Sequence, residues 1–225
     1  IYIATPFSYK AAKWLNDNNL KIFKIGSGEC NNIPFIKYVC SFKKPMIIST
    51  GMNSLETVKK TIRIVKKHKI PHAILHCINL YPVDYKYIRL GRLNKMIQTF
   101  KSSIIGYSDH SIGNTIPIAA LALGAKIIEK HFVIEKNRKG PDIICSMDKT
   151  ELKDLLAASI KIHEAFSSNK EIISEEDKSR RFAFHSVVSK KDINKNEVLS
   201  WKNLTTKRPG TGDFLSHKIY SLIGR

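Results

Sequence analysis

The sequence predicts an α/β fold: a TIM-type (β/α)8 barrel that lacks its first two strand–helix units, followed by a small, truncated domain. Strand-like and helix-like segments alternate through the first three quarters of the 225 residues. Six such units occupy about 167 residues, whereas a closed barrel of eight units needs about 250. Polar residues follow every strand, and no glycine-rich phosphate turn follows the first. Both observations favour the barrel over an open doubly wound sheet.

Six short apolar segments are the expected strands. They lack a strict alternation of apolar and polar residues, as is typical of parallel strands that are buried on both faces. The segments are Ile1–Ala4, Ile22–Ile25, Met46–Ser49, Ala73–Cys77, Ile104–Tyr107 and Ala125–Glu129.

Caps and apolar stripes mark the helices between these strands. Asn53 stands at capping-box spacing from an acidic residue, and an apolar stripe of helical period follows it. Asn114 is expected to cap the helix before the sixth strand, with Pro117 in its first turn and Gly124 past its end. A last helix is expected to begin near Asp148.

The predicted barrel domain spans residues 1–167. Residues 168–183 are rich in serine and acidic residues and are predicted to be a linker. Residues 184–225 begin with a strand pattern at Phe184–Val188, and a second strand pattern resumes at Val198–Leu199 after a turn-rich stretch. About 40 residues make a poor independent core, so we expect this last part to be a truncated domain.

The charge of the chain is strongly basic, with 38 basic and 19 acidic residues and a net charge of +19. Nucleic-acid binding is one interpretation of such a charge. The basic residues are scattered as short pairs, however, and no RNA-binding or helix-turn-helix pattern accompanies them. We therefore predict no nucleic-acid partner, although the positive field would attract a small anionic substrate.

No apolar stretch approaches the ~20 residues that a membrane helix needs, and no signal-peptide pattern is visible, so no membrane partner is predicted. The four cysteines lie far apart without metal-binding or redox spacing. Buried free thiols in a reducing cytoplasm fit this spacing better than a disulfide framework, and a cytoplasmic location is expected.

Residues at or after the strand ends would meet at the carboxyl-terminal rim of a barrel, where active sites form. Among them is a set of hydrogen-bond donors with one fixed cation, which suits a phosphate or carboxylate ligand. One such serine alone is more often a helix cap, but five residues in register that include a lysine favour an anion site. The set is Lys24, Ser27, Ser49, Asn79 and Ser108.

Two histidines, His110 and His131, stand just past the ends of consecutive strands. They could bind a metal through neutral imidazole nitrogens, or they could be rim residues that bond only to the backbone. Glu29 and Asp142 are candidates for an acid–base role or for holding sugar hydroxyls, with a solvated loop carboxylate as the alternative for Asp142. Lys24 could instead be the Schiff-base lysine of an aldolase.

Several motifs, taken in combination, resemble the sialic acid synthase family, the bacterial N-acetylneuraminate synthases. They are Lys24–Asn32, Ile48–Asn53, Leu75–Pro82, Gly106–Ser111, Glu129–Phe132 and Gly140–Asp142. The segment Lys207–Gly212 resembles the start of the family's C-terminal antifreeze-like (SAF, β-clip) domain, which implies that 184–225 is the N-terminal part of that domain.

The resemblance implies a metal-assisted condensation of phosphoenolpyruvate with the open-chain aldehyde of N-acetylmannosamine. Water adds to the former enol carbon, and phosphate leaves by C–O cleavage. The implied metal is Mn²⁺, with Mg²⁺ or Co²⁺ as alternatives. In this family two further strands precede the segment matched here and carry a glutamate thought to be catalytic, so the 225 residues alone are expected to be inactive.

The resemblance also implies roles for individual residues. His110 and His131 would bind the metal, and Arg208 would reach into the partner subunit's site in a domain-swapped homodimer. Glu29, Lys24 and Asp142 would carry the catalysis, and Glu29, Tyr81 and Asp142 would hold or orient the sugar. The residues implied to bind phosphoenolpyruvate are Thr5, Lys24, Ser27, Ser49, Asn79 and Ser108.

Two alternative functions stay open. A sister enzyme would make legionaminate or pseudaminate from a diacetamido hexose. The residues found in the motifs Gly26–Glu29 and Asn79–Tyr81, however, favour N-acetylneuraminate as the product. A non-catalytic polyanion-binding protein would instead use the charge of +19 and would be indifferent to the loss of His110.

Overall fold

Six parallel strands form one sheet, in the order β1-β2-β3-β4-β5-β6. Their bounds are Ile3–Ala4, Ile22–Ile25, Met46–Ser49, His72–Cys77, Ile104–Asp109 and Ile128–Lys130. The computed structural model describes residues 1–166 and 172–225, and this sheet belongs to the first of two compact units, Ile1–Ser167 and Ser168–Arg225. The sequential strand order is that of a barrel wall, because doubly wound sheets reverse their order near the middle.

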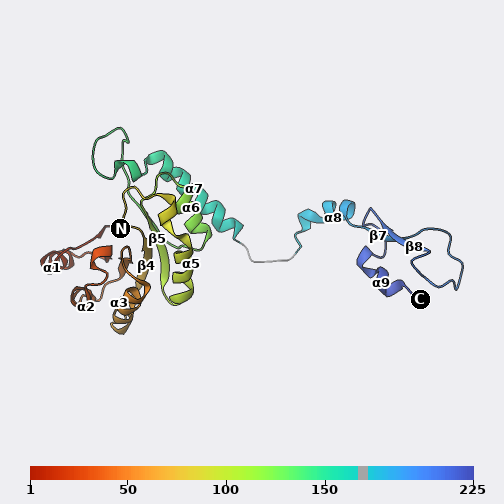
Figure 1. The fold of residues 1–225 in the computed structure, drawn as a ribbon, viewed down its shortest axis with the longest axis horizontal. Helices are drawn as coiled ribbons and strands as arrows, with labels where there is room; N and C mark the ends of the chain where they lie inside the picture. Colours follow the sequence, from red (N-terminus) through yellow and green to blue (C-terminus); the bar gives the residue numbers. More distant parts are fainter. Residues whose placement is uncertain (167–171) are drawn as a thin grey trace. The chain divides into compact units, whose positions relative to one another are not determined.

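Seven helices of the described part of this unit connect or follow the strands. They are α1 (Tyr9–Asp17), α2 (Ile33–Ser41), α3 (Leu55–Lys67), α4 (Tyr85–Ile88), α5 (Leu90–Thr99), α6 (Thr115–Ala122) and α7 (Lys149–Ala165). Figure 1 shows α1, α2 and α3 on one flank of β4 and β5, and α5, α6 and α7 on the other.

Alternate residues of each strand face opposite sides of the sheet. One set, which includes Phe23, Ile48 and Tyr107, is buried against the helices in the hydrophobic core. The intervening set points to the other face and is largely polar toward the carboxyl ends of the strands. Its members include Lys24, Ser49, Cys77, Ser108 and Glu129. The helix-facing residues therefore form the core, and the other set carries the chemistry.

The sheet is strongly curved. Lys24 of β2 and Glu129 of β6 approach to 3.3 Å between Nζ and Oε1, although three strands lie between them. In a flat sheet, strands four places apart would be separated by about 19 Å. The curvature is therefore that of a barrel wall, and polar side chains of distant strands converge on its inner face. The number of units in a complete barrel stays a prediction.

The predicted strands at Ile22–Ile25 and Met46–Ser49 are confirmed. The sixth strand begins later than predicted, at Ile128 rather than Ala125. Ala125 still donates its backbone N–H to the carbonyl of Ala120, 3.0 Å away, and so belongs to the turn that ends α6. The apolar run that begins at Ala125 thus includes both the turn after α6 and the start of β6.

The predicted cap of α3 at Asn53 is wrong. Ser54 is the N-cap, and its hydroxyl accepts from the backbone N–H of Thr57 at 3.1 Å. The Asn53 amide instead donates to the backbone carbonyls of Ser27 (2.8 Å) and Gly51 (2.7 Å). It therefore ties together the loops that follow β2 and β3.

The ends of α6 and α7 lie as predicted. Asn114 precedes α6, Pro117 lies in its first turn, and Gly124 follows with a positive φ of 102°. The Asn114 amide, however, donates to the carbonyl of Glu151 rather than capping its own helix. Asp148 and Glu151 form a reciprocal capping box at the start of α7.

The second unit contains two antiparallel strands, β7 (Ser186–Ser189) and β8 (Leu204–Lys207), with short helices α8 (Asp177–Ala183) and α9 (Ile219–Leu222). The strand predicted at Val198–Leu199 is wrong, because the backbone of Leu199 pairs with the end of the chain, donating to the Arg225 carbonyl at 2.8 Å.

The predicted linker 168–183 is only partly described, since residues 168–171 lie outside the described residues. Its last part is helical, because α8 occupies Asp177–Ala183. The assignment of the second unit to the antifreeze-like domain stays a prediction.

Of the helices in the described ranges, none is both long and apolar enough to cross a membrane. The four cysteines are free and buried, as predicted. Burial raises the pKa of the Cys30 thiol to about 11, so this thiol stays protonated at neutral pH.

Candidate active site

One open cavity of about 290 Å³ lies at the carboxyl ends of the strands. Its walls come from the ends of β2, β5 and β6 and from the loop after β1. The lining residues are Thr5, Lys24, Ser108, Asp109, His110, Glu129, Lys130 and His131. The cavity therefore brings together both predicted metal ligands and three of the residues predicted to hold an anion.

Two of these lining residues, Lys24 and Ser108, together with Ser49, which bonds to Lys24, are called the cradle below. All three are buried. The Lys24 ammonium donates to Ser49 Oγ at 2.8 Å and lies 3.3 Å from Glu129 Oε1. Ser108 Oγ donates to the same carboxylate oxygen at 2.8 Å. Two of the three cradle residues therefore already contact an anionic oxygen, which here belongs to the protein.

Two further residues predicted to bind the anion, Ser27 and Asn79, lie side by side around Gly51. The backbone N–H of Gly51 donates to Ser27 Oγ at 3.0 Å. A Cβ added at Gly51 would lie 1.7 Å from Asn79 Oδ1 and 2.9 Å from Ser27 Oγ. Only glycine lets the loop after β3 pass between these two side chains.

The rings of His110 and His131 are neighbours in an edge-to-face arrangement, with centroids 5.4 Å apart. His110 Nδ1 lies 2.7 Å from the carbonyl oxygen of Ile78, and because a carbonyl only accepts, Nδ1 carries the proton and Nε2 keeps its lone pair. Burial lowers the pKa of His110, and the neighbouring His131 lowers it further, so the ring is neutral at pH 7. The Tyr81 ring packs on His110 with centroids 4.0 Å apart.

This donor set fits a divalent transition metal in part. Neutral imidazoles are suitable ligands for such ions. Among residues 1–166 and 172–225, however, no group of three or more His, Cys, Asp or Glu side chains is placed to hold a metal. Two histidines would therefore supply part of a coordination shell, and water or substrate would have to supply the rest.

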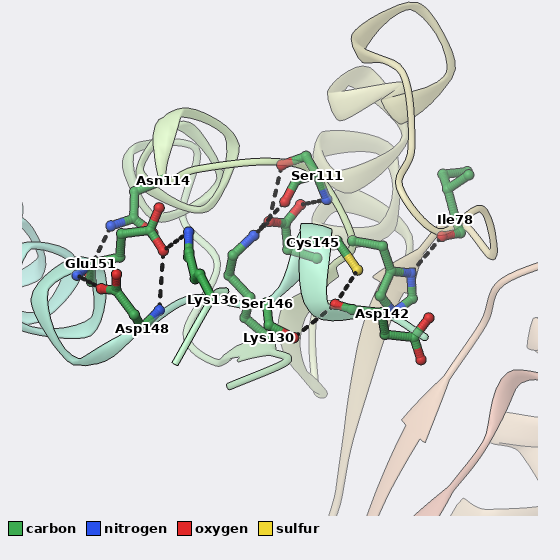
Figure 2. Close-up of polar contacts among 12 residues, drawn as sticks. Ile78, Ser111, Asn114, Lys130, Lys136, Asp142, Cys145, Ser146, Asp148 and Glu151 are labelled. Atoms are coloured by element: carbon green, nitrogen blue, oxygen red, sulfur yellow. Dashed lines mark hydrogen bonds and ion pairs between the residues drawn. The ribbon is translucent and has the colours of Figure 1, made fainter. Parts of the chain in front are cut away.

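A buried ion pair between Asp109 and Lys130 lies directly beside the two histidines in the chain. Lys130 Nζ donates to Asp109 Oδ2 and to the Ser111 carbonyl, and Ser111 donates its N–H and hydroxyl to the Asp109 carboxylate (Figure 2). The side chains of Asp109 and Lys130 are 0% and 1% exposed. Because these residues adjoin His110 and His131, the pair fixes the ends of β5 and β6 relative to each other.

Asp142 lies in the loop after β6, in a turn that its own backbone stabilises. Its carbonyl accepts from Cys145 Sγ at 3.2 Å and from Ser146 Oγ at 2.8 Å (Figure 2). Its φ is positive, at 61°. Burial raises the pKa of Tyr81, a second predicted sugar ligand, and nearby acidic groups that include Asp142 raise it further.

Seven of the predicted site residues are not among those that line this cavity: Ser27, Glu29, Ser49, Asn79, Tyr81, Asp142 and Arg208. Glu29 ends a short 3-10 turn (Ser27–Glu29), and its carboxylate accepts from the Asn32 amide at 2.8 Å. Arg208 belongs to the second unit, where it is exposed and its guanidinium lies 5.9 Å from the centroid of the Phe182 ring. Their roles in catalysis and in a homodimer stay predictions.

Glu129 is one of three cavity residues, with Asp109 and Lys130, to which the sequence analysis assigned no functional role. It pairs in register with Ser108 and lies between Ile128, which packs against the helix-side core, and Lys130. The alternation of faces along β6 would have indicated that its carboxylate points to the same side as Ser108.

Comparisons with known proteins agree on one family. Residues 1–171 match the NeuB family. The N,N'-diacetyllegionaminic acid synthase of Campylobacter jejuni is 39% identical over 215 residues, which cover 94% of this chain and 64% of that protein. Human N-acetylneuraminate-9-phosphate synthase is 31% identical over 225 residues, which cover 100% of this chain and 63% of that protein.

A solved structure is similar as well. The crystal structure of an N-acetylneuraminic acid (sialic acid) synthetase from Leptospira borgpetersenii, in complex with citrate, matches with a TM-score of 0.73 at 30% identity. The match covers 78% of this chain and 62% of that one. The chain thus spans less than two thirds of the length of each of these proteins.

Proposed function

The chain belongs to the NeuB family, and on this premise we propose that it carries the anion and metal sites of a nonulosonate synthase. The reaction proposed is the condensation of phosphoenolpyruvate with N-acetylmannosamine to give N-acetylneuraminate and phosphate. One observation carries this proposal: Lys24 and Ser108 of the cradle and the pair His110 and His131 line a single open cavity. An anionic reactant and an electrophile could therefore meet there.

The cradle supports the binding of phosphoenolpyruvate. The Lys24 ammonium and the Ser108 hydroxyl lie within 3.3 Å of one oxygen position, and Ser49 accepts a hydrogen bond from the same ammonium. Charge-assisted hydrogen bonds of this kind bind carboxylates and phosphates. Ser27, Asn79 and Thr5 would extend the contacts along the rim. These groups would hold the enol ester with its C3 directed toward the histidine side of the cavity.

The other side of the cavity supports the binding of the sugar. His110 Nε2 and His131 would hold Mn²⁺, or Mg²⁺ or Co²⁺ in its place. Such a cation, when bound, would polarise the aldehyde oxygen as a Lewis acid. Tyr81 keeps its proton at neutral pH because its pKa is raised, so it would donate a hydrogen bond to the sugar. Asp142 would accept from a hydroxyl, and Glu29 would move a proton.

The proposed reaction balances as follows. A carbon–carbon bond forms between C3 of phosphoenolpyruvate and the aldehyde carbon, and the aldehyde oxygen gains a proton. Water adds to C2, and the C2–O bond to phosphate breaks, so that inorganic phosphate leaves with the bridging oxygen. The residues of this chain would hold the two reactants in line and stabilise the anionic groups.

A sister function is favoured by one observation, the 39% identity to a protein named N,N'-diacetyllegionaminic acid synthase. In that case a diacetamido hexose would replace N-acetylmannosamine in the same cavity. The test is a substrate panel with the longest natural protein that contains this chain. Mass spectrometry of the acid product is expected to show N-acetylneuraminate, and turnover of the diacetamido sugar alone would assign the sister function.

Gly51→Ala is expected to weaken phosphoenolpyruvate binding by about tenfold, because the new methyl group displaces Asn79 and Ser27. Overpacking of this kind also costs roughly 1–3 kcal/mol of stability. Isothermal titration calorimetry of the 225-residue chain measures the affinity. Gly91→Ala is the matched control, because a Cβ at that position in α5 has no atom within 4 Å. Unchanged binding by Gly51→Ala would remove Ser27 and Asn79 from the anion site.

A further inference from the structure

We propose that Glu129 sets the affinity of the cavity for anions, because its carboxylate occupies the cradle in the free protein and must leave before an anion binds. This inference rests on the proposed function, since it concerns the same cavity. It adds a residue that none of the roles above includes.

The contacts of Glu129 are those of a bound anion. Its Oε1 atom lies 3.3 Å from Lys24 Nζ and accepts from Ser108 Oγ at 2.8 Å. The side chain of Lys24 is only 11% exposed, and an ammonium at that depth is costly without a partner. Glu129 therefore stabilises the free protein by neutralising the cradle from within.

Glu129 is also able to leave. Its side chain is 43% exposed and opens on the cavity, so the carboxylate would move toward water rather than into the core. The other carboxylate that lines the cavity, Asp109, is fully buried and is bound by Lys130 and Ser111. Of these two acidic residues, Glu129 is the one placed to exchange with a ligand.

An incoming carboxylate or phosphate would compete with Glu129 for the same donors. Two anionic groups beside one ammonium repel each other, and like charges in contact weaken binding strongly. The free energy needed to release Glu129 therefore subtracts from the binding of any anion that uses Lys24 and Ser108. Removal of its charge should tighten binding, whereas removal of an ordinary ligand-binding residue weakens it.

The test is the variant Glu129→Gln in the 225-residue chain, titrated with phosphoenolpyruvate and with inorganic phosphate by calorimetry. The amide can still accept from Ser108 but does not hold the ammonium as an ion pair. Both ligands are expected to bind roughly tenfold more tightly than to the parent chain. Glu129→Met, which is uncharged and of similar volume, is expected to gain affinity as well. Glu135→Gln is the matched control, since Glu135 is exposed beyond β6, and is expected to bind as the parent does.

Unchanged or weaker binding by both Glu129 variants would overturn the proposal. Lys24→Met separates this failure from a failure of the proposed function. If Lys24→Met abolishes binding while neither Glu129 variant tightens it, the cradle is correct and only the role of Glu129 is wrong. If Lys24→Met binds as the parent does, or no protein of the set binds either ligand, both proposals fall.

Discussion

Lys24→Met is expected to lower the affinity for phosphoenolpyruvate by at least about thirtyfold, because removal of one partner of a buried charge pair costs roughly 2–5 kcal/mol. The ammonium is the cation of the cradle and donates to Ser49 at 2.8 Å. Methionine keeps most of the volume of the side chain, so the variant should fold. Calorimetric titration of the 225-residue chain, with circular dichroism to verify folding, measures the effect.

Lys21→Met provides the control for net charge. Lys21 precedes the same strand and is exposed, where it donates to Asn19 at 2.9 Å. It is expected to bind phosphoenolpyruvate as the parent chain does. Equal losses in the two variants would indicate a general effect of the charge of +19. Such a result, together with salt-sensitive retention of nucleic acid, would favour the polyanion-binding alternative.

The contacts of Lys24 also bear on the Schiff-base alternative. An aldolase of that type needs a free amine nitrogen that can attack a carbonyl carbon. The nitrogen of Lys24 is instead engaged by Ser49 and Glu129. This arrangement favours an electrostatic role for Lys24, and borohydride trapping in the presence of substrate distinguishes the two roles.

His110→Ala and His131→Ala are each expected to lower the affinity for Mn²⁺ by at least about a hundredfold. Mutation of a residue that only hydrogen-bonds to a metal ligand already lowers metal affinity by about 10–100-fold, and loss of the ligand itself should cost at least as much. The centroids of the two rings are 5.4 Å apart, and the bond from His110 Nδ1 to the Ile78 carbonyl leaves Nε2 available. Electron paramagnetic resonance of free Mn²⁺ during titration of the chain measures the affinity. In the longest natural protein that contains the chain, both variants should abolish metal-dependent turnover.

His163→Ala is the matched control, because His163 is an exposed residue of α7. It is expected to bind Mn²⁺ with the affinity of the parent chain. If His110→Ala and His131→Ala also bind Mn²⁺ as the parent does, the histidines are rim residues that bond only to the backbone, and the metal proposal fails.

A strand could be predicted from the sequence where turn-forming or polar residues bound its apolar run at both ends. Met46–Ser49, which lies between Pro45 and Thr50, is an example. β5 extends two residues beyond its predicted end, to Asp109, because Ser108 and Asp109 still pair with β6. A hydropathy pattern ends a strand at its last apolar residue, whereas backbone pairing does not depend on the side chain. The polar rim of a buried sheet is therefore where such predictions stop early.

Tertiary contacts explain the errors. Asn53 has the composition of a helix cap, but the carbonyls of Ser27 and Gly51 take its amide, and the neighbouring Ser54 caps the helix. In the second unit, Leu199 pairs with the end of the chain instead of forming the predicted strand. Neither partner is visible in a local window of sequence.

The site itself could be predicted only where residues lie at or just after the ends of strands. Lys24, Ser108 and His110 meet in the cavity because strand order fixes the rim on which they lie. Glu29 and Asp142 lie on turns whose course depends on local bonds, such as that from Asn32 to Glu29. The sequence could not place their carboxylates relative to the cavity.

The most direct test of the central claim follows the bridging oxygen of phosphoenolpyruvate. The longest natural protein that contains this chain is incubated with Mn²⁺, N-acetylmannosamine and phosphoenolpyruvate labelled with ¹⁸O between C2 and phosphorus. Phosphate release is expected only with both substrates, and the label is expected in the phosphate. Label retained in the sugar acid, or no phosphate above background with any hexosamine of the panel, would contradict the proposed condensation.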